Sequence, residues 1–332
     1  MVSKSTLQKA SEKNIINPDQ IEPLYQFIKN EKSNSLTESK EEPLKFIRSF
    51  GDVFIALGVI LLVVSINMTS LSGYYYLLPA VGFIVIAEWL VRIRRLALPG
   101  IVILLAILYF INKAFSFQSE DATTMGLAVI CVSSLLFYLR YKMPFSLLPL
   151  AASLVAITVI QIGIDVLNSP LIFVIMGFII FSIAMGFDSR DTKRQSHLSD
   201  SAFWLHLLAA PLIVHGAMIS LLTSDQAWVQ SFSNNILMII FFAGFFLVAL
   251  FVDRRAMLVS TQLYAIYALT QLLQNNLINE QNVMIYVLMA LGMFVIFFGT
   301  YWYKTRRIIF GMLADSKISK FVPDLKTLDT KK

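Results

Sequence analysis

Long apolar runs dominate the chain from residue 50 to about residue 303, with short polar stretches between them. A hydrocarbon core of ~30 Å needs about 17–25 helical residues, which is close to the length of these runs. None of them alternates in the way a membrane-spanning strand would, and lipid offers the backbone no partner outside a helix or closed barrel. The pattern predicts an all-α, polytopic membrane protein with about ten transmembrane helices. The predicted spans are 50–68, 74–91, 96–112, 123–139, 144–164, 170–187, 201–223, 234–252, 256–274 and 282–303.

The basic residues between the runs predict the orientation of the helices. Alternate loops hold ten Lys and Arg, the two tails hold eight each, and the other loops hold Lys113 alone. With ten spans and both ends inside, 26 of the 27 basic residues are therefore cytoplasmic. An excess of Lys and Arg marks the cytoplasmic side, so both termini are expected there.

Composition excludes the main alternatives to a membrane protein. The chain is 57% hydrophobic and 14% charged, too apolar for a soluble domain. Its 26 Phe and 12 Tyr do not fit a disordered chain. The net charge of +6 is explained by a basic face toward anionic lipid, so the bilayer is an expected partner and nucleic acid is not.

The polarity pattern divides the chain into four parts. Residues 1–32 are predicted to form a cytosolic helical hairpin, with a capping box at Asn17 and Gln20, and 33–49 a polar linker. Residues 50–303 form the transmembrane bundle, and 304–332 a cytosolic tail whose start is amphipathic and suits the headgroup layer. A hairpin of this size cannot bury a core alone, so it is expected to dock on the membrane, on a second copy or on a cytosolic protein.

Ionisable residues near the ends of the spans are expected to be caps or interfacial ion pairs. Asp52 begins the first span and Asp253 ends the eighth. Glu88 lies one turn before Arg92, which gives an i, i+4 pair, yet its apolar neighbours also make it a candidate for a solute or proton pathway.

Two further polar positions lie within the spans. Gln161 and Asp165 share a face at the outer end of the fifth span and suit either a cation or polar solute, or a hydrogen bond at the interface. Gln262 in the ninth span is expected to face the bundle interior, because lipid would leave its amide without a partner.

The seventh span holds the strongest functional candidates. It contains His206 and His215, which nine helical positions place on opposite faces and ~13.5 Å apart along the axis, too far to share a metal. Trp204 and Pro211 share the His215 face, and Pro211 frees the carbonyl of Leu207. This pattern favours a solute pocket or proton path, and the alternative is a pair of packing histidines in a kinked helix.

The sequence carries no catalytic, cofactor or metal motif, so no cofactor and no metal ligand are predicted, and an enzyme is not favoured. It has no GxSxG, Walker loop, GxGxxG or HExxH, and its single cysteine, Cys131, lies within a span. Gly292 and Gly299 in the tenth span form a small-residue stripe that predicts close helix packing.

The segments 17–30, 54–62 and 202–215 resemble a family of bacterial multi-pass membrane proteins with a short cytosolic N-terminal helical domain and no assigned activity. The resemblance implies that the protein lies in a bacterial inner membrane. Ten spans also divide into two halves of five, and an odd number of spans gives the two halves opposite orientations in the membrane. This is the plan of inverted-repeat carriers such as the drug/metabolite transporters.

Three functions follow from these observations. The first is a small-solute or proton-coupled carrier with the seventh span lining the pathway. The second is a membrane scaffold or sensor that recruits a partner through its N-terminal helices. The third is an intramembrane enzyme acting on lipid.

Overall fold

The computed structural model describes most of the chain and is helical throughout its regular secondary structure. The described residues are 4–13, 15–28, 49–69, 71–115, 120–163, 170–192, 194, 196–222, 232–276, 280–313, 316 and 321–323. They contain helices but no strand, which confirms the all-α prediction. The chain divides into two units, residues 1–44 with 328–332, and residues 45–327.

The first unit contains a short helical hairpin. Its elements are α1 (Lys4–Glu12), the 3-10 helix η1 (Pro18–Gln20) and a helix over 21–28. The predicted capping box is confirmed, because the Gln20 side chain accepts a hydrogen bond of 3.0 Å from the backbone N–H of Asn17. Leu7 of α1 is buried in this small unit.

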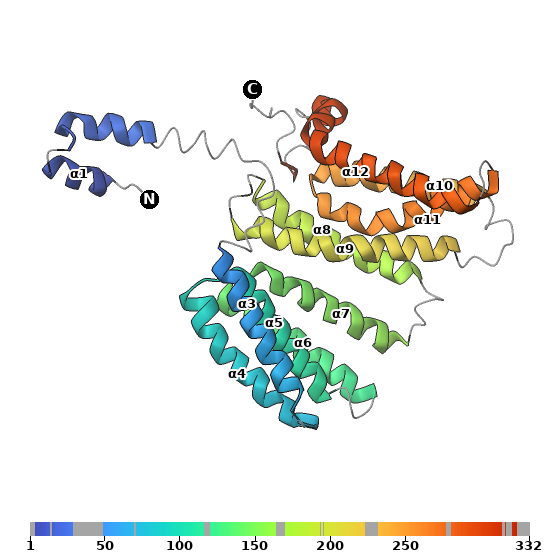
Figure 1. Cartoon of the computed structure of the whole chain (residues 1–332), viewed down its shortest axis with the longest axis horizontal. Coiled ribbons are helices and arrows are strands. Elements are labelled where there is room, and N and C mark those ends of the chain that lie inside the picture. Colours follow the sequence, from blue (N-terminus) through green and yellow to red (C-terminus); the bar gives the residue numbers. More distant parts are fainter. Residues whose placement is uncertain are drawn as a thin grey trace. The chain divides into compact units, whose positions relative to one another are not determined.

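Each of the ten apolar runs forms a helix in the second unit (Figure 1). The α-helices are α3 (Phe50–Asn67), α4 (Leu77–Ala87), α5 (Ala97–Phe115), α6 (Glu120–Tyr141), α7 (Leu147–Ile162), α8 (Pro170–Arg190), α9 (His197–Leu222), α10 (Phe232–Val252), α11 (Val259–Asn276) and α12 (Glu280–Phe310). The short helices are η2 (Gly73–Tyr76), the π-helix η3 (Glu88–Ile93), η4 (Pro144–Ser146), η5 (Arg255–Leu258) and η6 (Gly311–Leu313).

Eight helices in the described part of the chain are long and apolar enough to cross a membrane. They are Phe50–Asn67, Gly73–Ile93, Ala97–Phe115, Thr123–Tyr141, Pro144–Ile162, Pro170–Arg190, His197–Ile219 and Val283–Leu313. The described apolar part of α10, Ile236–Val252, is shorter, and α11 carries more polar residues. The fold is thus that of a helical membrane protein, and the count of ten spans stays a prediction.

Two helices organise the bundle. In the first set of five, α5 contacts α3, α4 and α6, and Ile103, Leu104 and Phe110 on α5 are fully buried. In the second set, α9 contacts α8, α10 and α11, and it also contacts α7 of the first set. Figure 1 shows α9 between α7 and α11, and α9 contacts both. The two sets therefore pack differently, and the predicted inverted repeat stays a prediction.

Two glycines bring α8 and α9 into backbone contact. A Cβ on Gly177 of α8 would lie 2.6 Å from Ile213 Cγ1 and 2.9 Å from the Ile213 nitrogen on α9. A Cβ on Gly216 of α9 would lie 2.7 Å from the Pro170 oxygen and 2.9 Å from the Val174 nitrogen on α8. Only glycine allows this approach, and it aligns the two antiparallel helices closely along their length.

The described part of the chain shows no close packing at the predicted stripe on α12, and that prediction is wrong. A Cβ on Gly292 or Gly299 would meet nothing within 4 Å. Which glycines pack is decided by the neighbouring helix rather than by spacing along one helix.

Four residues other than glycine adopt the left-handed conformation in the turns that follow helices. These residues follow η3, α6, α8 and α10 and are Arg95, Lys142, Arg194 and Asp253, with φ between 52° and 62°. The conformation costs an L-residue roughly 1–2 kcal/mol, so each position stores strain.

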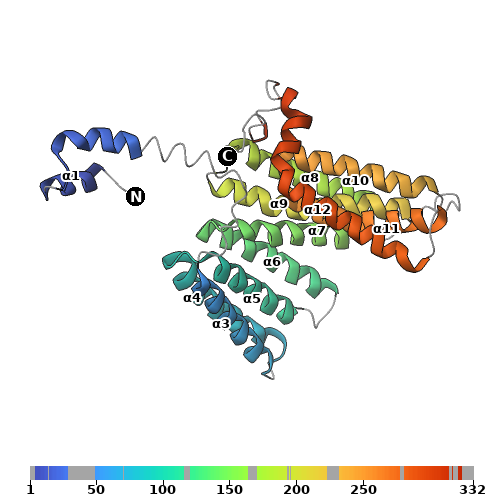
Figure 2. The ribbon, with the colours of Figure 1, turned by 45° about the horizontal axis from the view of Figure 1, so that its top comes forward.

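The last helix continues past the expected end of the tenth span. α12 bends at Tyr301 (φ −102°, ψ 19°), and its final turns leave the axis of the preceding helix (Figure 2). Ile308, Met312 and Leu313 are exposed there, and the headgroup-layer position of this segment stays a prediction.

Candidate functional site

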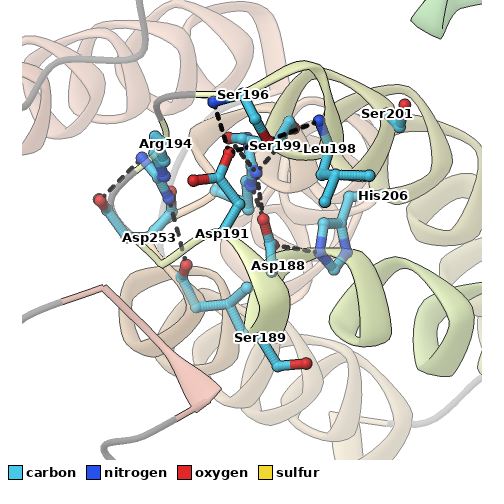
Figure 3. Close-up of polar contacts among 12 residues, drawn as sticks. Asp188, Ser189, Asp191, Arg194, Ser196, Leu198, Ser199, Ser201, His206 and Asp253 are labelled. Carbon is cyan, nitrogen blue, oxygen red and sulfur yellow. Dashed lines mark hydrogen bonds and ion pairs between the residues drawn. The ribbon is translucent and has the colours of Figure 1, made fainter.

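A buried cluster of charged side chains joins α8, α9 and the end of α10 (Figure 3). The Asp188 carboxylate accepts hydrogen bonds from His206 Nε2 at 3.0 Å and from Arg254 Nε at 3.2 Å, both to Oδ2. Arg254 Nη2 donates to the other carboxylate oxygen. Asp188 and Arg254 are each 2% exposed and His206 is 0% exposed. A carboxylate, a guanidinium and an imidazole thus share one site that is closed to solvent.

Local structure explains how the three side chains meet. Asp188 lies in the last turn of α8, where the helix dipole disfavours a carboxylate, so the charge requires cationic or donor partners. His206 lies on the facing helix α9, nine residues after its start. Arg254 follows the left-handed residue Asp253, which turns the chain sharply at the end of α10.

Two hydrogen bonds fix the orientation of the Arg254 side chain. Its Nη2 donates to the backbone oxygen of Ser199 at 3.0 Å and to Ser199 Oγ at 3.1 Å. The Arg254 backbone N–H donates to the Ala249 oxygen at 2.9 Å. The guanidinium is therefore held between the start of α9 and the end of α8.

A second buried ion pair lies beside the first. Arg194 Nη1 is 3.0 Å from Asp253 Oδ2, and Arg194 Nη2 donates to the Asp253 backbone oxygen at 2.6 Å. Trp302 Nε1 of α12 donates to Asp253 Oδ1 at 2.6 Å. Asp253 thus pairs with Arg194, and its neighbour Arg254 pairs with Asp188. Two adjacent residues therefore connect the end of α10 to the α8–α9 segment through two ion pairs.

The Nδ1 nitrogen of His206 has no hydrogen-bond partner among the described residues. The His206 side chain is fully buried. Because Nε2 binds a carboxylate oxygen, it carries the hydrogen, and neutral imidazole then presents a lone pair at Nδ1. The ring packs edge-on against Phe181, with centroids 5.1 Å apart. Buried polar atoms are rarely left unpaired, so this nitrogen marks a functional candidate.

Of the predicted candidates, only His206 belongs to this cluster. His215 binds the Tyr264 hydroxyl of α11 through Nδ1 and is exposed. Trp204 packs edge-on against Phe145 of η4, with centroids 4.8 Å apart. Pro211 lies half-buried inside a continuous α9.

The other candidates lie on different helices. Gln262 is half-buried on α11, and Gln161 is exposed near the end of α7. Asp165 lies outside the described residues.

Glu88 forms a separate, more exposed cluster in the first set of helices. Its carboxylate accepts from Arg140 Nε at 2.9 Å, from Arg92 Nη1 at 3.1 Å and from the Tyr141 hydroxyl at 3.0 Å. The Glu88 side chain is 37% exposed. The expected pair with Arg92 is present, and Arg140 adds a contact from α6 that joins the two helices.

The sequence did not single out Asp188, Arg254 or Arg194 as members of a site. Asp188 follows the predicted sixth span by one residue, and Arg194 and Arg254 lie in two different basic loops. From the sequence, all three therefore resemble ordinary charged residues at the membrane interface. Residue spacing carries no signal that would pair residue 188 with residue 254. His206 was identifiable because a polar side chain within an apolar run is unusual.

No protein-family model, curated protein or solved structure matches the chain. Within the described part of the chain, no three His, Cys, Asp or Glu residues are grouped so that they could hold a metal ion. The groups of the cluster can exchange a proton at His206 and recognise charge through Asp188 and Arg254.

Proposed function

We propose that this protein is a proton-coupled carrier of a small solute, in which α9 lines the pathway and His206 holds the proton. The observation that carries the proposal is the buried, unpartnered Nδ1 of His206 beside a carboxylate and a guanidinium. Imidazole changes charge near physiological pH, which suits a group that gains and loses a proton in each cycle.

A purely structural role explains the ion pair but not the histidine. Asp188 and Arg254 neutralise each other and are bound by several hydrogen bonds. Leaving a buried polar atom without a hydrogen bond costs about 1–3 kcal/mol, which an apolar side chain at this position would avoid. The unpaired nitrogen therefore favours a role in proton exchange over packing alone.

The charge pattern supports a matching topology. We infer ten spans with both termini in the cytoplasm, since this arrangement places 26 of the 27 basic residues on that side. The resemblance to bacterial multi-pass proteins supports a place in a bacterial inner membrane. On this topology the buried cluster lies at the cytoplasmic end of α8, α9 and α10.

Proton flux in proteoliposomes tests the carrier. Vesicles containing the full chain and trapped pyranine are given a panel of amino acids, sugars, organic anions and quaternary ammonium ions, one at a time. We expect at least one solute to change the internal pH, and His206→Gln to abolish this change. His197→Gln is the matched control, because His197 is an exposed histidine on the same helix. Equal fluxes from wild type and His206→Gln, or no proton movement with any solute, would contradict the proposal.

A scaffold or sensor is the second candidate, because the N-terminal helices belong to a unit separate from the bundle. Such a protein would recruit a cytosolic partner through its first 32 residues. It predicts that deleting residues 1–32 abolishes the cellular phenotype while His206→Gln leaves it intact. The carrier predicts loss of the phenotype with His206→Gln.

A further inference from the structure

The charges in the buried cluster suggest which class of solute accompanies the proton. Two carboxylates, Asp188 and Asp253, pair with two guanidiniums, Arg254 and Arg194, so these two ion pairs carry no net charge. Resting on the carrier function proposed above, we propose that the solute is a monoanion that binds Arg254 as a proton binds His206.

A proton alone is poorly accommodated in this site. The charged groups acting on the imidazole are Asp188 of α8, Arg254 after α10 and Arg194 of the α8–α9 segment, and Arg194 is balanced by Asp253. Protonation of Nδ1 leaves one uncompensated positive charge among side chains that are closed to water. A buried charge without a partner is strongly disfavoured, so the proton requires an accompanying negative charge.

Arg254 is the group that can receive this charge. His206 Nε2 and Arg254 Nε bind the same oxygen, Oδ2 of Asp188. When the imidazole becomes an imidazolium, it competes with Arg254 for that carboxylate and weakens the hold of Asp188 on the guanidinium. Ser199 still orients Arg254 Nη2, so the N–H groups that Asp188 releases can bind a carboxylate or sulfonate of the solute.

Charge balance then sets the stoichiometry. The empty site holds the Asp188 carboxylate, the Arg254 guanidinium and a neutral imidazole. The loaded site adds one positive charge at the protonated His206 and one negative charge on the anion, so the two states carry the same net charge. An anion alone or a proton alone would change the net charge of the site by one unit. The coupling is therefore one proton to one monoanion, and the translocation step carries no net charge.

Hydrophilic monoanions with neutral analogues test this assignment in proteoliposomes of the full chain. Gluconate and isethionate cross lipid poorly, and glucose and taurine are their analogues without net charge. We expect gluconate or isethionate to carry protons inward at one proton per anion, measured with pyranine and radiolabel. Valinomycin–potassium potentials of either sign should leave this rate unchanged, and glucose and taurine should move no protons.

Two variants separate anion binding from folding. Arg254→Gln leaves the Asp188 charge buried and so threatens folding, whereas the double variant Asp188→Asn with Arg254→Gln removes both charges. The double variant should elute as the folded protein in size-exclusion chromatography. It should lose anion uptake roughly ten- to hundredfold, the value of a charge-assisted hydrogen bond.

The outcomes distinguish this inference from the carrier proposal. Proton-coupled uptake of a neutral or cationic solute that requires His206 overturns the anion assignment and leaves the carrier in place. Uptake that responds to membrane potential, or full anion uptake by the folded double variant, overturns it as well. No proton movement with any solute refutes both.

Discussion

The close approach of α8 and α9 predicts a large difference between two glycine-to-alanine substitutions on the same helix. Gly177 faces the backbone of Ile213, whereas a Cβ on Gly186 would meet nothing within 4 Å. Both substitutions add one methyl group to α8, so intrinsic helix propensity affects them equally. The difference between them therefore reports the packing of α8 against α9.

The magnitude follows from the distances. A Cβ on Gly177 would lie 2.6 Å from Ile213 Cγ1 and 2.9 Å from the Ile213 nitrogen. Carbon atoms prefer about 3.5–4.0 Å, so the first contact is short by roughly 1 Å. Ile213 can move its side chain but not its backbone nitrogen, and the helices must separate. Such overpacking costs about 1–3 kcal/mol, whereas Gly186→Ala gains about 0.5–1 kcal/mol of helix stability.

Reversible unfolding in mixed dodecylmaltoside and sodium dodecyl sulfate micelles, followed by circular dichroism, measures both free energies. We expect Gly177→Ala to be less stable than Gly186→Ala by about 1–3 kcal/mol, the cost of overpacking, because the gain in helix propensity is common to both substitutions and cancels. A difference below about 0.5 kcal/mol would refute the backbone contact, since that is the size of an ordinary surface effect.

Three other substitutions test the ion pairs and the helix ends, with stability measured in the same micelles. Asp253→Ala should cost up to about 3–5 kcal/mol, because it removes the carboxylate that pairs with the mostly buried Arg194 and accepts from Trp302. Glu88→Ala at the more exposed cluster should cost clearly less, and equal losses would contradict the difference in burial. Trp302→Phe should cost about 1–3 kcal/mol through the lost hydrogen bond to Asp253, and an unchanged unfolding midpoint would show that the bond contributes nothing. Lys142→Gly should raise the free energy of unfolding by about 0.5–1 kcal/mol, because glycine relieves the left-handed strain. Arg194→Gly should lower it, because this substitution also removes an ion pair. A loss of stability in both variants would argue against strain at residue 142.

The helices could be predicted from the sequence because lipid imposes a local requirement. Every backbone group in a span must be paired within that span, so an apolar run of sufficient length forms a helix whatever surrounds it. The capping box at Asn17 and Gln20 is equally local and was predictable for the same reason. His206 could be identified as a candidate because a single polar side chain in such a run requires a partner.

The partners of these groups could not be predicted because they depend on how the helices pack. Asp188 and Arg254 are 66 residues apart and meet only because the close α8–α9 pair lies beside the end of α10. The glycine stripe on α12 has the same spacing signal as a packed interface, but a Cβ on either glycine would meet no described atom within 4 Å. Hydropathy and spacing describe one helix at a time and carry no information about the facing surface.

The backbone contact between α8 and α9 also limits how the bundle can move. Helices that meet through side chains can slide past each other as rotamers change. The backbones of α8 and α9 touch at Gly177 and Gly216, so rotamer changes cannot accommodate such sliding there. The pair therefore turns as one rigid body, and relative motion is confined to its side-chain interfaces with α7, α10 and α11 and with the short helices η4 and η5. Asp188 and His206 both lie on this rigid body, whereas Arg254 lies at the end of α10. Any rotation of the pair thus changes the distance from the carboxylate to the guanidinium while the distance from the carboxylate to the imidazole stays fixed.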